Sequence, residues 1–218
     1  MGSIIQNAAN NVGANGIFSS SALNNSSLSG ISALPSGVAG DLKLLTTATA
    51  SASASLSFNS TYINSSYKIF KFEWINTAPS TGADMTVNFS TDNGSNYNVT
   101  KTTTLFTTTH YTNDSFTELG YNTGRDLAQS TAELQLEANI GTQSDMGVSG
   151  HLYLFNPSST TYVKHLISRN NLAHQTYTTN WFVAGYCNTT SAINAVRFKY
   201  TSGNVQVGTF KLYGIGAN

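Results

Sequence analysis

The sequence predicts an all-β protein, a two-sheet antiparallel β-sandwich of the jelly-roll type. About ten short runs alternate apolar with polar side chains, the period of a half-buried strand. Gly, Asn, Ser and Pro separate these runs, and no intervening segment has the length or 3.6-residue period of a substantial helix. No repeat of fixed period is present, which favours a sandwich over a propeller.

The expected strands follow one another from residue 42 to the C-terminal region. In chain order they cover 42–47, 55–58, 67–75, 85–89, 97–103, 133–140, 148–156, 161–168, 180–187, 193–201 and 207–215. Alternation is clearest in 67–75, where Phe70, Phe72 and Trp74 share one face. Residues 113–129 are the least regular, and we expect a loop there with one helical turn.

The run ELQLEANI, residues 133–140, predicts a strand with one apolar and one polar face. The apolar set is Leu134, Leu136, Ala138 and Ile140, and the polar set is Glu133, Gln135, Glu137 and Asn139. An uninterrupted strand therefore turns Glu137 away from the core.

The segment STDNGSNY, residues 90–97, matches the spacing of a propeller Asp-box and contains the start of a calcium-loop pattern. The Asp-box spacing occurs once, whereas a propeller repeats it, and Thr103 stands where a calcium loop requires Glu. Asp, Asn and Gly tolerate the left-handed backbone of tight turns. We therefore expect a hairpin turn between strands 85–90 and 97–103, with SGN at 202–204 and GTQSD at 141–145 as further turns.

Residues 1–40 differ in character from residues 41–218, which form the expected sandwich domain. The first segment is small, polar and Gly-rich, and its isolated apolar residues follow no period, so it cannot build its own core. We expect an extended N-terminal arm that docks on neighbouring chains. Its apolar contact residues are Ile4, Ile5, Ile17, Phe18, Leu23, Leu28 and Ile31.

The composition limits the classes of partner. Charged residues make up 9% of the chain and the formal net charge is zero, so no electrostatic footprint for nucleic acid or an anionic membrane exists. No run of about 18 apolar residues predicts a membrane span, and no secretion signal is expected at the N-terminus. An uncharged surface rich in hydroxyls and amides suits a protein held in an assembly or working outside a cell.

The sequence nominates no catalytic residue, metal ligand or cofactor. His151 and His165 fall in strands on either side of one loop, but no Asp, Glu or Cys stands beside them at ligand spacing. The single cysteine, Cys187, lies in an apolar run and is expected to be buried and inert. A glycan hydrolase would need two carboxylates facing each other in a cleft.

Aromatic residues outside the expected core are the candidates for ligand contact. Tyr111, Tyr121 and Tyr177 stand in loop-like contexts, and Trp181 stands at the start of a strand. Tyr and Trp rings in such positions can stack on sugar rings, which makes these four residues candidate contacts for a host glycan.

Five segments resemble a family of small virion structural proteins from marine tailed bacteriophages. They are LLTTATASASASLSF, STDNGSNY, GRDLAQ, LYLFNPSSTTYVKH and VAGYCNTTSAINAVRFKYTSGNVQVGTFKLYGI. The resemblance covers residues 41–215 and is most specific in LYLFNPSSTTYVKH and in the final SGN and KLYG elements. It implies a jelly-roll-like virion protein with no catalytic residues to transfer.

The resemblance places the protein on a virion surface, after synthesis in the host cytoplasm and release by lysis. The main expectation is a capsid decoration or cement protein, clamped by its arm to neighbouring subunits. Its partners would be the major capsid protein or tail proteins, and by analogy with other jelly-roll virion proteins we expect a homotrimer. The alternative is a tail-fibre or receptor-binding module that recognises host surface glycan.

Overall fold

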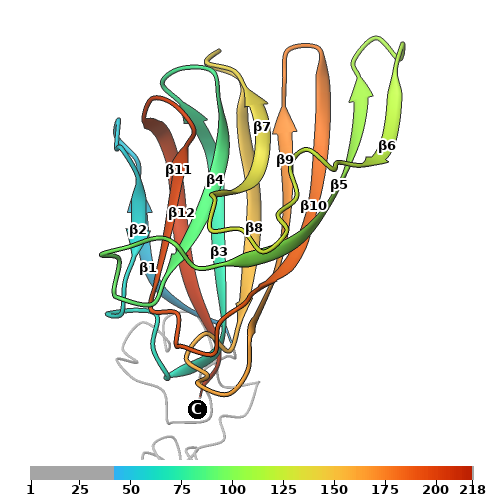
Figure 1. The fold of residues 1–218 in the computed structure, drawn as a ribbon. Helices are drawn as coiled ribbons and strands as arrows, with labels where there is room; N and C mark the ends of the chain where they lie inside the picture. The colour runs from blue at the N-terminus through green and yellow to red at the C-terminus, as the bar shows by residue number, and fades with distance from the viewer. Residues whose placement is uncertain (1–41, 218) are drawn as a thin grey trace, which may run out of the picture. The chain divides into compact units, whose positions relative to one another are not determined.

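The computed structural model describes residues 42–217, which form twelve strands and no helix. The arm residues Ile4 to Ile31 named above lie outside this range. The strands are β1 Leu42–Thr49, β2 Leu56–Phe58, β3 Tyr67–Pro79, β4 Ala83–Ser90, β5 Lys101–Tyr111, β6 Thr117–Tyr121, β7 Leu134–Ile140, β8 Gly147–Phe155, β9 Lys164–Ala173, β10 Tyr177–Cys187, β11 Ala195–Tyr200 and β12 Val205–Ala217. All strand pairings are antiparallel, and the two sheets form a sandwich (Figure 1).

The strand order is that of a jelly roll, which confirms the predicted fold class. The eight-stranded sheet has the order β1-β12-β3-β8-β9-β10-β5-β6, and the four-stranded sheet has the order β2-β11-β4-β7. Eight strands pair in nested fashion: β1 with β12, β2 with β11, β3 with β8, and β4 with β7. This nesting is a long hairpin rolled into two sheets.

The remaining four strands extend the large sheet beyond the small one. They enter as two inserted pairs, β5–β6 between β4 and β7, and β9–β10 between β8 and β11. Figure 1 shows β5 and β6 at the far end of the large sheet from β1. Because β7 is the last strand of the small sheet, part of the inner face of the large sheet has no second sheet over it.

The core between the sheets is strongly aromatic. The Phe198 ring lies 5.5 Å from both Phe72 and Trp74 and 5.6 Å from Phe210, measured between centroids. Such tilted pairs contribute about 0.5–1.5 kcal/mol each beyond the burial of their area. Phe70, Phe72 and Trp74 are buried as their alternation predicts.

The segment STDNGSNY forms a turn, but the expected hairpin is wrong. Asn93 and Gly94 have φ of 61° and 91°, and the Asp92 carboxylate accepts hydrogen bonds from Ser90 and Asn96. These bonds lower the pKa of Asp92 to about 2. However, β4 belongs to the small sheet and β5 to the large one, so the turn begins a crossover between sheets. The turns 141–145 and 202–204 likewise join strands of different sheets.

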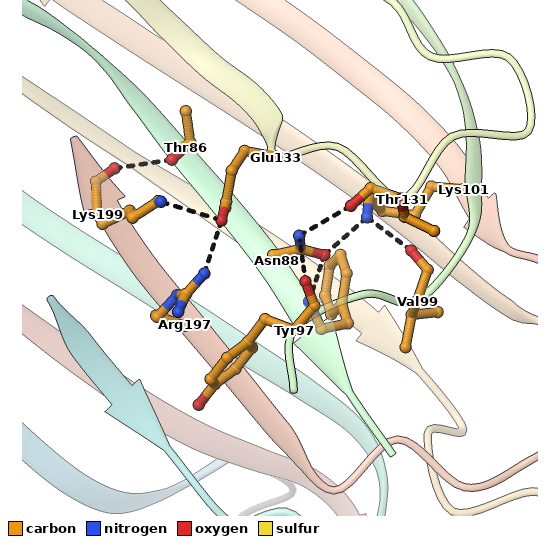
Figure 2. A network of polar contacts seen from close by, with 10 residues as sticks. Thr86, Asn88, Tyr97, Val99, Lys101, Thr131, Glu133, Arg197 and Lys199 are labelled. Carbon is orange, nitrogen blue, oxygen red and sulfur yellow. Dashed lines mark hydrogen bonds and ion pairs between the residues drawn. The ribbon is translucent and has the colours of Figure 1, made fainter. Parts of the chain in front are cut away.

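A buried polar network fixes this crossover (Figure 2). The Asn88 amide donates to the carbonyls of Tyr97 (2.8 Å) and Thr131 (3.2 Å), and Lys101 Nζ donates to Asn88 Oδ1 and to the Val99 carbonyl, each at 2.7 Å. Burial lowers the pKa of Lys101 to about 8. These groups satisfy one another, so the network holds the crossover rather than a ligand.

Glu133 forms a neighbouring ion-pair cluster, which Arg197 links to this network through the Tyr97 ring. Glu133 Oε1 lies 2.7 Å from Arg197 Nη2 and 3.3 Å from Lys199 Nζ (Figure 2). The Arg197 guanidinium also lies 4.2 Å from the centroid of Tyr97, so the crossover is held by a cation–π contact as well.

Two further expectations have mixed outcomes. Residues 113–129, expected as a loop with a helical turn, contain the strand β6 and no helix. The Cys187 thiol is fully buried, which confirms the expected burial, and this burial raises its pKa to about 12 and so disfavours the reactive thiolate.

Candidate functional site

A cleft of about 390 Å³ opens where the large sheet extends past β7. We call it the aromatic cleft. It is lined by Thr107, Thr109 and Tyr111 of β5, Phe116, Glu118, Asn122 and Arg125 in and around β6, Glu137, Ala138 and Asn139 of β7, and Tyr177, Thr179 and Trp181 of β10. Rings, hydroxyls, amides and carboxyl groups therefore share one hollow.

A column of stacked rings forms one wall of the cleft. His174 stacks on Tyr177 at 4.1 Å, Tyr177 stacks on Tyr111 at 5.5 Å, and Phe116 packs edgewise on Tyr111 at 5.2 Å. The antiparallel pairing of β10 with β5 sets Tyr177 directly opposite Tyr111. Both faces of Tyr177 are covered by other rings, so what Tyr177 offers to a ligand is its edge and its hydroxyl.

Trp181 is a buried part of the cleft rather than an open stacking surface. It is the fifth residue of β10, not at a strand start as expected, and only 5% of it is exposed. The Arg125 guanidinium lies over its ring, 5.5 Å from the centroid. Cation–π attraction holds the guanidinium against the indole, so the guanidinium covers that face of the ring.

Arg125 is itself fixed by hydrogen bonds from neighbouring strands. Its Nη1 donates to Asp84 Oδ2 at 2.9 Å and to Gln135 Oε1 at 2.8 Å, and Gln135 Nε2 donates to Asp84 Oδ2 at 3.0 Å. The Asp84 carboxylate compensates the charge of the guanidinium, so the pair adds little net charge to the cleft.

Glu137 is buried, contrary to the polar face predicted for it. Val87 pairs with Leu134 but Met85 pairs with Glu137, so β7 has one extra residue between these pairs. This β-bulge turns Glu137 to the same side as Leu134 and Met85, which point into the sandwich. Burial raises the pKa of Glu137 to about 8, against the opposing hydrogen bonds from Ala138 and Thr179.

Three of the four predicted glycan contacts thus line one cleft, and the fourth lies elsewhere. Tyr121 is opposite Phe106, on the face of β5 that alternates with buried Leu105, and it donates a 2.7 Å hydrogen bond to Asp126. The predicted loop contexts were also imprecise, because Tyr111 and Tyr121 end their strands and Tyr177 begins one.

The outer face of the large sheet carries a second feature, which we call the outer aromatic patch. Its members are Phe106, Leu119, Tyr121, Ile167 and Phe182. Phe106 and Phe182 stack at 4.6 Å with 7° between their planes, and the Arg169 guanidinium lies 4.9 Å from the Phe182 centroid. Leu119 is 71% exposed, so the patch presents apolar surface to its surroundings.

The larger hollow of the described domain has less binding chemistry. It has about 690 Å³ and lies among β1, β3, β8, β9 and β12. Asp145 is the one charged side chain that lines it, and no aromatic ring does so. We therefore place the candidate site in the aromatic cleft.

His151 and His165 do not face each other across the paired strands β8 and β9. His151 of β8 is opposite Arg169 of β9, whereas His165 is opposite Tyr186 of β10. Within residues 42–217 no group of three His, Cys, Asp or Glu side chains is arranged to hold a metal ion.

The fold and the cleft define a jelly-roll domain with a hollow lined by aromatic and polar groups. The chain matches no model of a known protein family, no curated protein sequence and no solved structure. The chemistry of the cleft is therefore the basis for assigning a function.

Proposed function

We propose that this chain is a tailed-bacteriophage virion protein whose jelly-roll domain binds a carbohydrate of the host surface. The observation that carries the proposal is the convergence of Tyr111, Tyr177 and Trp181, from two paired strands, on one cleft that also presents hydroxyl and amide groups. The virion setting rests on the resemblance of residues 41–215 to phage structural proteins.

The cleft suits a sugar because a sugar has apolar C–H faces and many hydroxyls. Ring edges of the aromatic column provide the apolar contact, and side chains such as Thr107, Thr109 and Asn122 provide hydrogen bonds. The compensated Arg125–Asp84 pair leaves no strong positive field that would select an anionic ligand over a neutral one.

An array of neutral oligosaccharides with defined termini tests this proposal. We expect the full chain to bind a subset of them and Tyr111→Ala to weaken that binding about tenfold or more. Phe106→Ala is the matched control, because it removes an aromatic ring from the opposite face of the same strand. Absence of binding across the array, or equal loss in both variants, would reject the cleft as the carbohydrate site.

Hydrolysis is measured in the same experiment. Glu118 and Glu137 line the same cleft, and a glycosidase requires a pair of carboxyl groups. Our proposal is binding without turnover, so no reducing sugar should be released. If the wild type releases reducing sugar and both Glu118→Gln and Glu137→Gln abolish that release, the protein is a hydrolase and not a binding module.

A second candidate function is capsid decoration, in which the arm clamps the protein to neighbouring subunits. The exposed outer aromatic patch favours it, because apolar and aromatic surface of this kind is typical of protein–protein contacts. In this proposal the patch contacts another copy of the chain within a homotrimer. Light scattering should then give a trimer mass for the wild type and a monomer mass for Leu119→Glu with Ile167→Glu.

The position of the protein on intact particles separates the two functions. Cryo-EM density at the junctions between capsomers would support decoration. Density confined to the tail would support the receptor-binding module.

A further inference from the structure

The Glu137 carboxyl group has one satisfied and one unsatisfied oxygen. Oε1 accepts a hydrogen bond from the Ala138 backbone N–H at 3.2 Å and another from Thr179 Oγ1 at 3.0 Å. Oε2 is buried and makes no hydrogen bond within the described residues. The residue is fully buried and lines the aromatic cleft, so the unsatisfied oxygen belongs to a side chain of the cleft wall.

Within the described residues no ion pair engages this carboxyl group, although the charge of nearby Arg125 acts to lower its pKa. Arg125, from the loop after β6, is hydrogen-bonded to Asp84 of β4, and that carboxylate itself disfavours a charge on Glu137. Glu118 of β6 lines the same cleft, and from β10 the titratable neighbour is Tyr177. The charged groups around Glu137 are thus the acids Asp84 and Glu118 and the cation Arg125, which is already hydrogen-bonded to Asp84.

A neutral carboxylic acid fits these contacts better than a carboxylate. The two donors on Oε1 require an acceptor there, which leaves the proton on Oε2. An O–H group without an acceptor in a buried position is unfavourable, and a ligand oxygen that accepts its proton removes that penalty. The raised pKa of Glu137 agrees with the protonated form at neutral pH.

We infer that Glu137 presents the proton on Oε2 as a hydrogen-bond donor to an oxygen of the ligand bound in the aromatic cleft. This inference rests on the proposed carbohydrate binding and adds a role for one residue. The acceptor it selects is an uncharged sugar oxygen, a hydroxyl or an N-acetyl carbonyl.

The inference gives binding a pH dependence with a defined sign. Loss of the proton removes the donor, so affinity should be constant well below pH 8 and fall up to tenfold per pH unit above about 8. Glu137→Gln should bind equally at low and high pH. The two donors on Oε1 keep the amide oxygen at that position, so the amide NH₂ replaces the O–H.

The test uses the strongest soluble oligosaccharide from the array, titrated calorimetrically against the full chain between pH 6 and pH 9.5. Glu137→Met has similar length without a donor, and we expect about tenfold weaker binding at pH 6. Phe106→Ala, on the opposite face of β5, is the matched control and should keep the pH profile of the wild type. Thermal unfolding of each variant shows whether the domain is intact.

The outcomes separate the inference from the proposed function. If the wild type binds no oligosaccharide, the proposed function fails and the role of Glu137 fails with it. If the wild type binds but Glu137→Met is as tight, or if wild type and Glu137→Gln share one pH profile, carbohydrate binding stands and the donor role is rejected.

Discussion

Replacing Glu137 by Gln should change how the stability of the domain depends on pH. In the folded chain burial raises the pKa of Glu137 to about 8, from the ordinary glutamate value of 4.5. Between these values the unfolded chain has lost the proton and the folded chain keeps it. The sign follows: this group favours folding fully below pH 4.5, and the advantage is lost as pH rises to about 8.

The magnitude follows from proton linkage. In this window the free energy of unfolding falls by about 1.4 kcal/mol per pH unit because of this one group. From pH 5 to pH 8 the fall is about 4 kcal/mol, a large part of the 5–15 kcal/mol typical of a domain. Gln does not titrate, so the variant should lack this slope.

Urea unfolding measured at several pH values checks this prediction, with Trp74 and Trp181 as fluorescent probes. The informative quantity is the variant-minus-wild-type difference in unfolding free energy, since it cancels other titrating groups such as Lys101. This difference should grow in favour of Glu137→Gln as pH rises, whereas Glu118→Gln, whose side chain is exposed, should give a flat difference. Parallel curves for Glu137→Gln and wild type would show that Glu137 is charged or solvated in the folded chain, and would refute the reasoning.

Three further predictions concern the fold. Phe198→Ala should lower the unfolding free energy by about 3–5 kcal/mol in urea titrations, because four aromatic rings surround this side chain; a loss below about 1 kcal/mol would contradict the aromatic core. Gly150→Ala should destabilise by more than about 1 kcal/mol, since its Cβ would lie 2.6 Å from the Arg169 carbonyl oxygen, while Gly120→Ala, with its nearest atom at 3.6 Å, should be nearly neutral in the same assay. A chain that begins at Asp41 should unfold at the same urea concentration as the full chain, because residues 42–217 contain a hydrophobic core of their own; a non-cooperative transition would show that residues 1–40 are required for folding.

The sequence predicts the strands well because alternation reports burial directly. In 67–75 the buried side chains are the apolar set that the period of two selects, and the fold class follows from the number and spacing of such runs. Turn chemistry at Asn93 and Gly94 is also predictable, since it depends on local backbone freedom.

Strand partners are not predictable in the same way. A turn signal shows that the chain reverses, but it does not show whether the next strand joins the same sheet. The sequence TDNGSN suits a hairpin, yet here it leads from β4 in one sheet to β5 in the other. The choice depends on contacts such as Asn88 with Tyr97, between segments that alternation does not relate.

Glu137 shows how a single extra residue defeats alternation. The period of two across 133–140 puts Glu137 with the polar set, but one extra residue between Leu134 and Glu137 turns Glu137 to the inner face, and a second register shift before Ile140 leaves Ile140 in the core. Bulges follow from the fit between paired strands, so the sequence of β7 alone carries no clear sign of this one. The candidate site depends on it, because the bulge brings the carboxyl group into the cleft wall.

The cleft does leave a trace in β5 that sequence reasoning could use. The inward positions of this strand run Leu105, Thr107, Thr109 and Tyr111, and their partners on β10 are Val183, Trp181, Thr179 and Tyr177. Leu105 and Val183 are buried in the core, whereas the positions beyond them carry hydroxyls and rings. A face that changes from aliphatic to hydroxyl-bearing along one strand marks the point where the opposing sheet ends. Two paired strands that change at the same register define one side of a hollow, because both strands then offer hydrogen bonds to a ligand.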